Sequence, residues 1–212
     1  MIVQSSEMSN ESGGETCREF IVYACPVGDL AQQLEAYFEK SRAIAPNKAH
    51  DYMPHCTLTG FFHDQKAAIP TYCTALDQAL REARSNQPKP AIAIQGLAFH
   101  PQWHGLELAS DWIKQLIAHF ARQARSASRR DDLRLKDWLH LSLAYGFDER
   151  YNEPLQQLAL TLVNPAAAVD WELRFYERIN SGGDPKSNPG DGTGSPQASQ
   201  SAMWICHQCW PI

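Results

Sequence analysis

The sequence has little positive charge. It holds 19 lysines and arginines against 24 aspartates and glutamates, which gives a formal charge of -5. A protein that coats long nucleic acid has to neutralise many phosphates at once. The composition therefore excludes long nucleic acid as a partner, whereas a small anionic substrate or an RNA end stays compatible with it.

Long apolar runs are also missing. No stretch approaches the roughly 18 consecutive apolar residues of a membrane span, and residues 1–16 lack the basic and apolar segments of a secretory leader. We therefore expect no membrane association and a cytoplasmic location. The cysteines lie scattered along the chain, and we interpret them as reduced thiols. They are Cys17, Cys25, Cys56, Cys73, Cys206 and Cys209.

What is present suits a globular domain. Hydrophobic residues make up 43% of the 212 residues, which is enough to bury a core. Two segments are too polar to join that core. Residues 1–16 are predicted to form a flexible tail, and residues 180–201, rich in Gly, Pro, Ser and Asp, a disordered insertion.

Apolar periodicity predicts strands and helices that alternate in two similar series. The first series has strands at 18–26, 55–62 and 91–99 and helices at 29–43 and 67–83; the second has strands at 103–109, 139–147 and 168–179 and helices at 111–124 and 153–162; a last strand covers 202–212. We predict an α+β fold, a single domain over 17–212 with two pseudo-symmetric lobes. The lobes are roughly 17–100 and 101–179 plus 202–212. Antiparallel sheets line a central cleft, and helices cover the outer faces.

One short phrase occurs in both series. His55-Cys56-Thr57-Leu58 and His140-Leu141-Ser142-Leu143 each place a hydroxyl two residues after a histidine. Residues i and i+2 of a strand share a face, so each strand offers an imidazole and a hydroxyl above an apolar underside. A single such histidine is commonly structural. The pair, at matching positions of the two series, indicates a shared site.

These groups suit phosphate ester chemistry. Cleavage of a phosphodiester needs a base for the attacking oxygen and an acid for the leaving oxygen, and His55 and His140 can hold these opposite protonation states near neutral pH. The hydroxyls of Thr57 and Ser142 can donate to the phosphate oxygens. No metal is needed for this division of labour, so we expect no metal and no other cofactor. The residues alone do not decide which histidine is the acid.

The paired pattern resembles the two-histidine (2H) phosphoesterase superfamily, which has two His-x-Ser/Thr-x motifs on strands of a bilobal, internally duplicated α+β fold. The segments "YMPHCTLTGFF" and "LHLSLAYGF" are also similar to the phosphoesterase-like segment of the T-cell ubiquitin ligand proteins. The resemblance covers roughly residues 18–179. It implies metal-independent hydrolysis of 2′,3′-cyclic phosphates of nucleotides or RNA ends, with His55 as acid and His140 as base. The final hairpin departs from the pattern because residues 180–201 interrupt it.

Other residues are candidates for contacts with the substrate. Tyr145 can stack on a base, and Arg134, in the basic loop 128–137, can contact a second phosphate. Lys48 and Tyr52 precede the first motif and are candidates of the same kind. Each residue also has a structural explanation that involves no substrate: Tyr145 can belong to the core, and the other three can lie on a solvated surface. Thr59, which Ala144 replaces in the second motif, is interpreted as structural.

Two further groups of residues are better explained by structural or surface roles than by metal binding or catalysis. Cys206 and Cys209 flank His207, but a regular strand would point the two thiols to opposite faces, which argues against zinc. His100 and His104 flank a turn and are interpreted as surface residues.

We therefore expect a monomeric phosphodiesterase whose partner is a nucleotide or a short RNA with a cyclic phosphate. The alternative is a module that binds nucleotides or RNA ends in the same cleft without turning them over. A zinc-dependent interaction protein is a third hypothesis.

Overall fold

A computed structural model describes residues 17–86, 92–179 and 203–212. The predicted tail and most of the predicted insertion lie outside these residues. The elements are β1 (Cys17–Val27), α1 (Asp29–Ile44), β2 (Cys56–Thr57), β3 (Phe62–Gln65), α2 (Ile69–Asn86), β4 (Ala93–His100), β5 (Trp103–Ala109), α3 (Asp111–Gln123), β6 (His140–Tyr145), α4 (Asn152–Leu162), β7 (Asp170–Ile179) and β8 (Met203–Pro211). The predicted order of helices and strands is confirmed, apart from one strand.

The predicted strand 55–62 is divided. Only Cys56 and Thr57 form β2, and the chain joins the sheet again at Phe62 as β3. Both pieces pair with β1, because Tyr23 lies opposite Thr57 and Phe20 opposite Phe62. Between them, the segment around Thr59 leaves the ladder to pair with Leu135.

The strands form one antiparallel sheet of eight strands, so the expectation of separate sheets is wrong. Its order is β4-β5-β6-β2-β1-β7-β8, and β3 also pairs with β1. Strands from the first series (β2, β1) and from the second (β5, β6) are joined where β2 meets β6. The α+β class is confirmed, whereas the pseudo-symmetry of two lobes stays a prediction.

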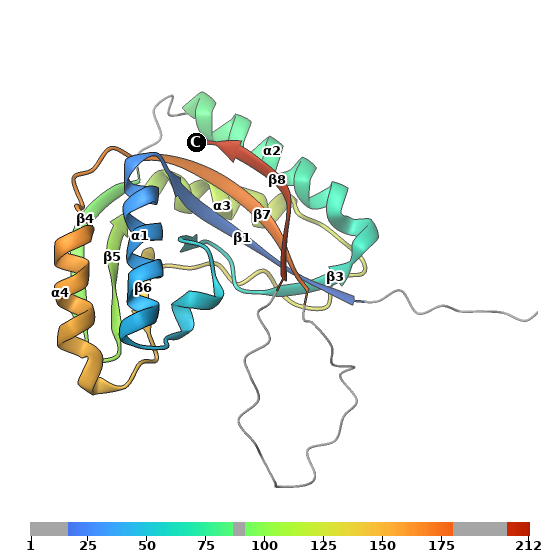
Figure 1. The fold of residues 1–212 in the computed structure, drawn as a ribbon. Coiled ribbons are helices and arrows are strands. Elements are labelled where there is room, and N and C mark those ends of the chain that lie inside the picture. Colours follow the sequence, from blue (N-terminus) through green and yellow to red (C-terminus); the bar gives the residue numbers. More distant parts are fainter. Residues whose placement is uncertain (1–16, 87–91, 180–202) are drawn as a thin grey trace, which may run out of the picture.

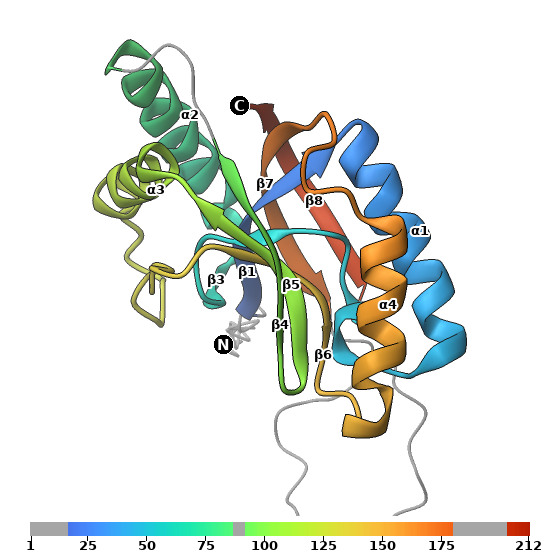
Figure 2. The ribbon, with the colours of Figure 1, turned by 90° about the vertical axis from the view of Figure 1, so that its left-hand side faces the viewer.

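The helices form two pairs. Figure 1 shows α1 beside α4, and Figure 2 shows this pair on one side of the molecule and α2 with α3 on the other. No helix in the described part of the chain is long and apolar enough to cross a membrane.

The main core lies between the helices and one face of the sheet. Phe20, Val22 and Ala24 of β1 join it, together with residues of all four helices. The alternate β1 residues, Ile21 and Tyr23 among them, are buried on the other face in a smaller cluster. Because side chains alternate along a strand, Ile21 and Tyr23 point to the face opposite the main core and can form one side of a pocket.

Candidate functional site

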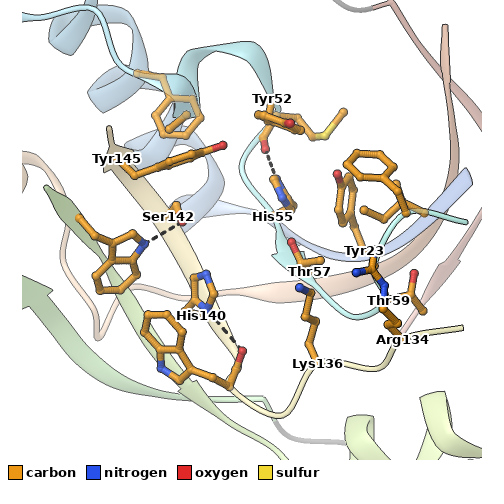
Figure 3. Close-up of a pocket in the computed structure, with 18 residues that line it drawn as sticks. Tyr23, Tyr52, His55, Thr57, Thr59, Arg134, Lys136, His140, Ser142 and Tyr145 are labelled. Carbon is orange, nitrogen blue, oxygen red and sulfur yellow. Dashed lines mark hydrogen bonds between the residues drawn. The ribbon is translucent and has the colours of Figure 1, made fainter. Parts of the chain in front are cut away.

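A pocket of about 370 Å³ opens above the centre of the sheet. Both motif histidines and both motif hydroxyls line it (Figure 3). The full lining is Ile21, Tyr23, Phe38, Ala49, Tyr52, Met53, His55, Thr57, Thr59, Gly60, Phe61, Trp103, Arg134, Lys136, Trp138, His140, Ser142 and Tyr145. The expectation that two distant histidines meet in one pocket is confirmed.

The pairing of β2 with β6 explains why they meet. Cys56 lies opposite Leu141 in antiparallel register. One residue to either side, this register sets His55 beside Ser142 and Thr57 beside His140. Directly opposed side chains have Cβ atoms about 5 Å apart, and diagonal ones about 7 Å, so the two imidazoles are diagonal neighbours. Cys56, Leu58, Leu141 and Leu143 are buried beneath them, as the strand pattern predicts.

Both histidines are held in the same way. Nδ1 of His55 lies 2.7 Å from the carbonyl oxygen of Met53, and Nδ1 of His140 lies 3.3 Å from that of Trp138. A carbonyl only accepts, so in each ring Nδ1–H donates and the neutral tautomer keeps its lone pair on Nε2. Each ring therefore presents Nε2 for proton transfer.

Aromatic rings fix the plane of each imidazole. Tyr23 packs against His55 with ring centroids 3.9 Å apart, and Trp138 stacks on His140 at 3.9 Å with an interplanar angle of 29°. Trp103 meets the His140 ring edge-on at 5.4 Å. These contacts limit rotation of the rings, so the two Nε2 atoms keep a fixed direction.

Both imidazoles are neutral at pH 7. Burial lowers the pKa of His55 to about 4, against the opposing effect of the Met53 carbonyl, and His140 lowers it further. Burial also lowers the pKa of His140, with Lys136 acting in the same direction and the Trp138 carbonyl opposing. Each neutral ring can therefore accept a proton at Nε2.

The hydroxyl of Ser142 has a defined partner. Nε1–H of Trp103 donates to Oγ of Ser142 at 3.0 Å. Since a hydroxyl has one hydrogen and two lone pairs, this bond leaves the Ser142 hydrogen free to donate. Figure 3 shows Thr57 on the opposite side, between His55 and Lys136.

Three of the four candidate substrate residues line the pocket. Tyr52 and Tyr145 lie side by side at one end (Figure 3), and burial, with Tyr52 adding to it, raises the pKa of Tyr145 to about 12. Arg134 lies at the other end. Lys48 does not line the pocket, and its side chain lies close to Gly146. The roles of all four stay predictions.

Sequence reasoning missed three aromatic residues that contact motif side chains: Tyr23, Trp103 and Trp138. Trp138 had a signal, because it precedes His140 by two residues and so shares its face. Tyr23 and Trp103 reach the site through strand pairings with Thr57 and Tyr145. Such pairings between distant segments leave no mark in a single sequence.

One interpretation needs correction and another is confirmed. His104 is fully buried rather than on the surface, and its Nε2 lies 2.9 Å from Oδ1 of Asn152. Thr59 is structural, as predicted, because its Oγ1 accepts a hydrogen bond from the buried N–H of Val22 at 3.1 Å.

Cys206 and Cys209 share a face, contrary to the expectation from a regular strand. Cys209 lies opposite Arg174 and Cys206 opposite Tyr176, and a bulge in β8 takes up the extra residue. His207 bonds to Glu177 instead, with Nε2 and Oε2 2.9 Å apart. Within the described ranges, no three His, Cys, Asp or Glu side chains are grouped to hold a metal ion.

No family model matches the chain. Among curated proteins it is similar to an ecdysteroid-phosphate phosphatase of Bombyx mori, with 32% identity over 169 residues that cover 76% of this chain and 24% of the relative. It is 29% identical over 167 residues to ubiquitin-associated and SH3 domain-containing protein B of Homo sapiens, covering 76% of this chain and 25% of that protein. It is 40% identical over 205 residues to ubiquitin-associated and SH3 domain-containing protein A of Homo sapiens, covering 76% and 30%. The chain thus spans less than a third of these relatives, whose names describe longer proteins.

Proposed function

We propose that this chain is a metal-independent phosphodiesterase that hydrolyses 2′,3′-cyclic phosphates of nucleotides or RNA ends. One observation carries the proposal. His55 and His140 line one pocket as diagonal neighbours on paired strands, and each Nδ1 is held by a backbone carbonyl. This arrangement suits an acid and a base that act on the same phosphorus.

The proposed reaction adds one water. The base removes a proton from water through Nε2 as the oxygen attacks phosphorus. The acid gives its Nε2 proton to the 2′ or 3′ oxygen as the bond from phosphorus to that oxygen breaks. A phosphate monoester leaves, and the proton on the base returns to the acid through solvent. By resemblance, His55 is the acid and His140 the base.

A bound phosphate raises the pKa of the histidine that acts as the acid. Burial keeps His55 largely neutral near pH 7, since it lowers the pKa to about 4. An anion in contact with an imidazole favours the charged form and raises its pKa. Substrate binding and protonation of the acid are therefore coupled. The hydroxyls of Thr57 and Ser142 donate to the non-bridging oxygens and hold phosphorus in line.

The names of two relatives support phosphoester hydrolysis as the general reaction, although this chain spans only 24% and 26% of them. The cyclic substrate rests on the 2H resemblance. A cytoplasmic location, a monomeric state and a duplicated bilobal layout belong to the same proposal. Because both relatives are named for ecdysteroid phosphates, such a phosphate is a second substrate to test.

The test is turnover of adenosine 2′,3′-cyclic phosphate in EDTA, measured for the wild type, His55→Ala and His140→Ala. His119→Ala is the matched control, since His119 lies on α3 and contacts Glu82. We expect each motif variant to lose on the order of 10² to 10⁴ in kcat and the control to keep its activity. Activity that survives in either motif variant would overturn the mechanism.

A binding module without turnover is the second candidate. The low pKa of His55 favours it, because the acid form is scarce near neutral pH. Tight binding of a nucleoside 2′-phosphate, with no product after long incubation with the cyclic compound, would support this alternative. Turnover of an ecdysteroid phosphate alone would reassign the substrate and reject both nucleotide proposals.

A further inference from the structure

Arg134 and Lys136 bring two cations into the pocket that holds the histidines. They lie on the segment between α3 and β6, and both are exposed. Within residues 17–86, 92–179 and 203–212, neither side chain forms an ion pair within 4.0 Å. Cations that face a pocket without a counter-ion are suited to an anionic ligand.

One acidic residue of the same loop, Asp131, is already hydrogen-bonded elsewhere. Asp131 lies in the adjacent groove with Arg134. Its Oδ2 accepts from the backbone N–H of His63 at 2.9 Å and lies 2.5 Å from Nδ1 of the same residue. That oxygen is held by His63, which is the main cause of the lowered pKa of Asp131, and the charge of Arg134 contributes to this lowering. Within the described residues, Asp131 forms no ion pair within 4.0 Å with Arg134 or Lys136, so it reduces their positive potential without binding either cation directly.

Backbone hydrogen bonds place the two cations. The N–H of Gly60 donates to the carbonyl of Arg134 at 2.7 Å, and the N–H of Lys136 donates to the carbonyl of Leu58 at 3.1 Å. Leu135 pairs with Thr59 between them. In such an extended pairing, residues 134 and 136 share a face, and it is the face that lines the pocket. The backbone at Arg134 and Lys136 is therefore held by pairing with residues 58–60 and is not part of a loose loop.

The two cations lie beside different residues of the pocket. Figure 3 shows Lys136 reaching toward Thr57 and His140, whereas Arg134 lies beyond it near Tyr23 and Thr59. Lys136 is close enough to contribute to the low pKa of His140. A phosphate held by the motif residues would thus contact Lys136, and a second anion would be needed to reach Arg134.

We propose that Arg134, with Lys136, forms a second anion subsite, so that the preferred ligand is a nucleotide with a second phosphate besides the one at the histidines. The guanidinium fork suits the paired oxygens of a phosphate. A 5′-phosphate of a mononucleotide and the preceding phosphodiester of an RNA end share this chemistry. The inference rests on the proposed function for the location of the first phosphate.

The test measures binding, which needs no turnover. Calorimetry compares adenosine 3′,5′-bisphosphate with adenosine 3′-monophosphate at one ionic strength. We expect the bisphosphate to bind tighter by on the order of tenfold in the wild type. Arg134→Gln reduces this ratio to near one, and Lys114→Gln, which removes the same charge from α3 outside the pocket lining, keeps it. Equal affinities in the wild type, or a ratio that Arg134→Gln leaves unchanged, would overturn the subsite.

Two further experiments are needed. One distinguishes a mononucleotide from an RNA end as the source of the second phosphate, and the other tests the subsite separately from the proposed hydrolysis. A dinucleotide with a 3′-phosphate replaces the bisphosphate, and tighter binding of the dinucleotide assigns the subsite to an RNA end, while tighter binding of the bisphosphate assigns it to a mononucleotide. Turnover of the matching cyclic phosphates is measured in parallel. A bisphosphate preference without turnover rejects the proposed hydrolysis and keeps the subsite, whereas turnover without preference does the opposite.

Discussion

Trp138 stacks on His140 with ring centroids 3.9 Å apart, the same separation as between Tyr23 and His55. The two aromatic residues differ in exposure, because Trp138 is 51% exposed and Tyr23 is 1% exposed. Trp138 can therefore be changed without opening the core, which makes it the better probe of how stacking affects a motif imidazole.

Trp138→Ala is expected to lower kcat about tenfold, because the freed imidazole samples directions that do not reach the substrate. It should also raise the pKa of His140 toward its usual value, since burial is the main cause of the lowered pKa. Titration of the His140 ring by NMR measures the second effect. Trp138→Phe keeps a stacking ring and is the control; a pKa that stays low in Trp138→Ala would contradict the role of the indole.

The pH dependence of kcat/KM should peak below pH 6.5. In the proposed reaction the free protein needs one imidazole charged and one neutral, and burial lowers the pKa of both, that of His55 to about 4. As the pH rises through the higher of the two pKa values the acid form is lost, and as it falls through the lower one the base is protonated. Initial rates between pH 4 and pH 9 give the profile, and an optimum above pH 7 would show that the histidines are not buried as described.

Thr57 and Thr59 form a matched pair for separating catalysis from stability. Thr57→Val removes a donor to the phosphate, so it should lower kcat/KM by about tenfold or more, with little change in the free energy of unfolding. Thr59→Val removes the acceptor of the buried Val22 N–H, so it should cost about 1 to 3 kcal/mol of stability. Urea unfolding and initial rates on both variants check the pair. Equal effects of the two substitutions on stability would contradict the assignment.

Asp64 is a buried carboxylate that ties β3 to the basic loop. It accepts hydrogen bonds from Tyr72 at 2.5 Å, from Ser128 at 2.5 Å and from the N–H of Gln65 at 2.7 Å. Burial raises its pKa, but hydrogen bonds from Ser126, Ser128 and Tyr72 outweigh this effect, so the pKa is lowered overall.

Asp64→Asn should therefore destabilise the fold by about 1.5 to 3 kcal/mol at pH 7, since an amide nitrogen cannot accept a hydroxyl proton. The folded pKa lies below the unfolded one, so this stabilisation is present above pH 4 and is lost as the pH falls through the folded pKa. Urea unfolding at pH 7 and pH 3 measures the difference between wild type and variant. The exposed Glu39→Gln on α1 is the control, and a difference that does not shrink at pH 3 would reject the charged form as its source.

The sequence was sufficient for the local structure and for the centre of the site. Alternation over 139–147 and a repeated spacing of histidine and hydroxyl predict which side chains share a face, because that depends only on the period of a strand. His55, Thr57, His140 and Ser142 were found in this way. Arg134 lies only a few residues before the second motif in the sequence, and the structure places it in the lining of the same pocket.

The rest depends on pairings that a strand pattern does not contain. The contact of Trp103 with Ser142 requires the register of β5 against β6, and the contact of Tyr23 with His55 requires that of β1 against β2. A single bulge reversed the predicted facing of Cys206, because one extra residue moves every later side chain to the other face. His104 was misplaced for a similar reason, since it contacts Asn152 at the start of α4 and the ring of Phe147, both distant from it in the sequence.

Strands β2 and β6 pair at one residue pair, Cys56 with Leu141, so few backbone contacts join them beneath the pocket. A molecule that binds both imidazoles adds contacts between these two strands. Binding of such a molecule favours the native state by mass action, so the melting temperature should rise with the concentration of any compound that contacts both His55 and His140. Thermal shift becomes a direct screen for what the protein holds there.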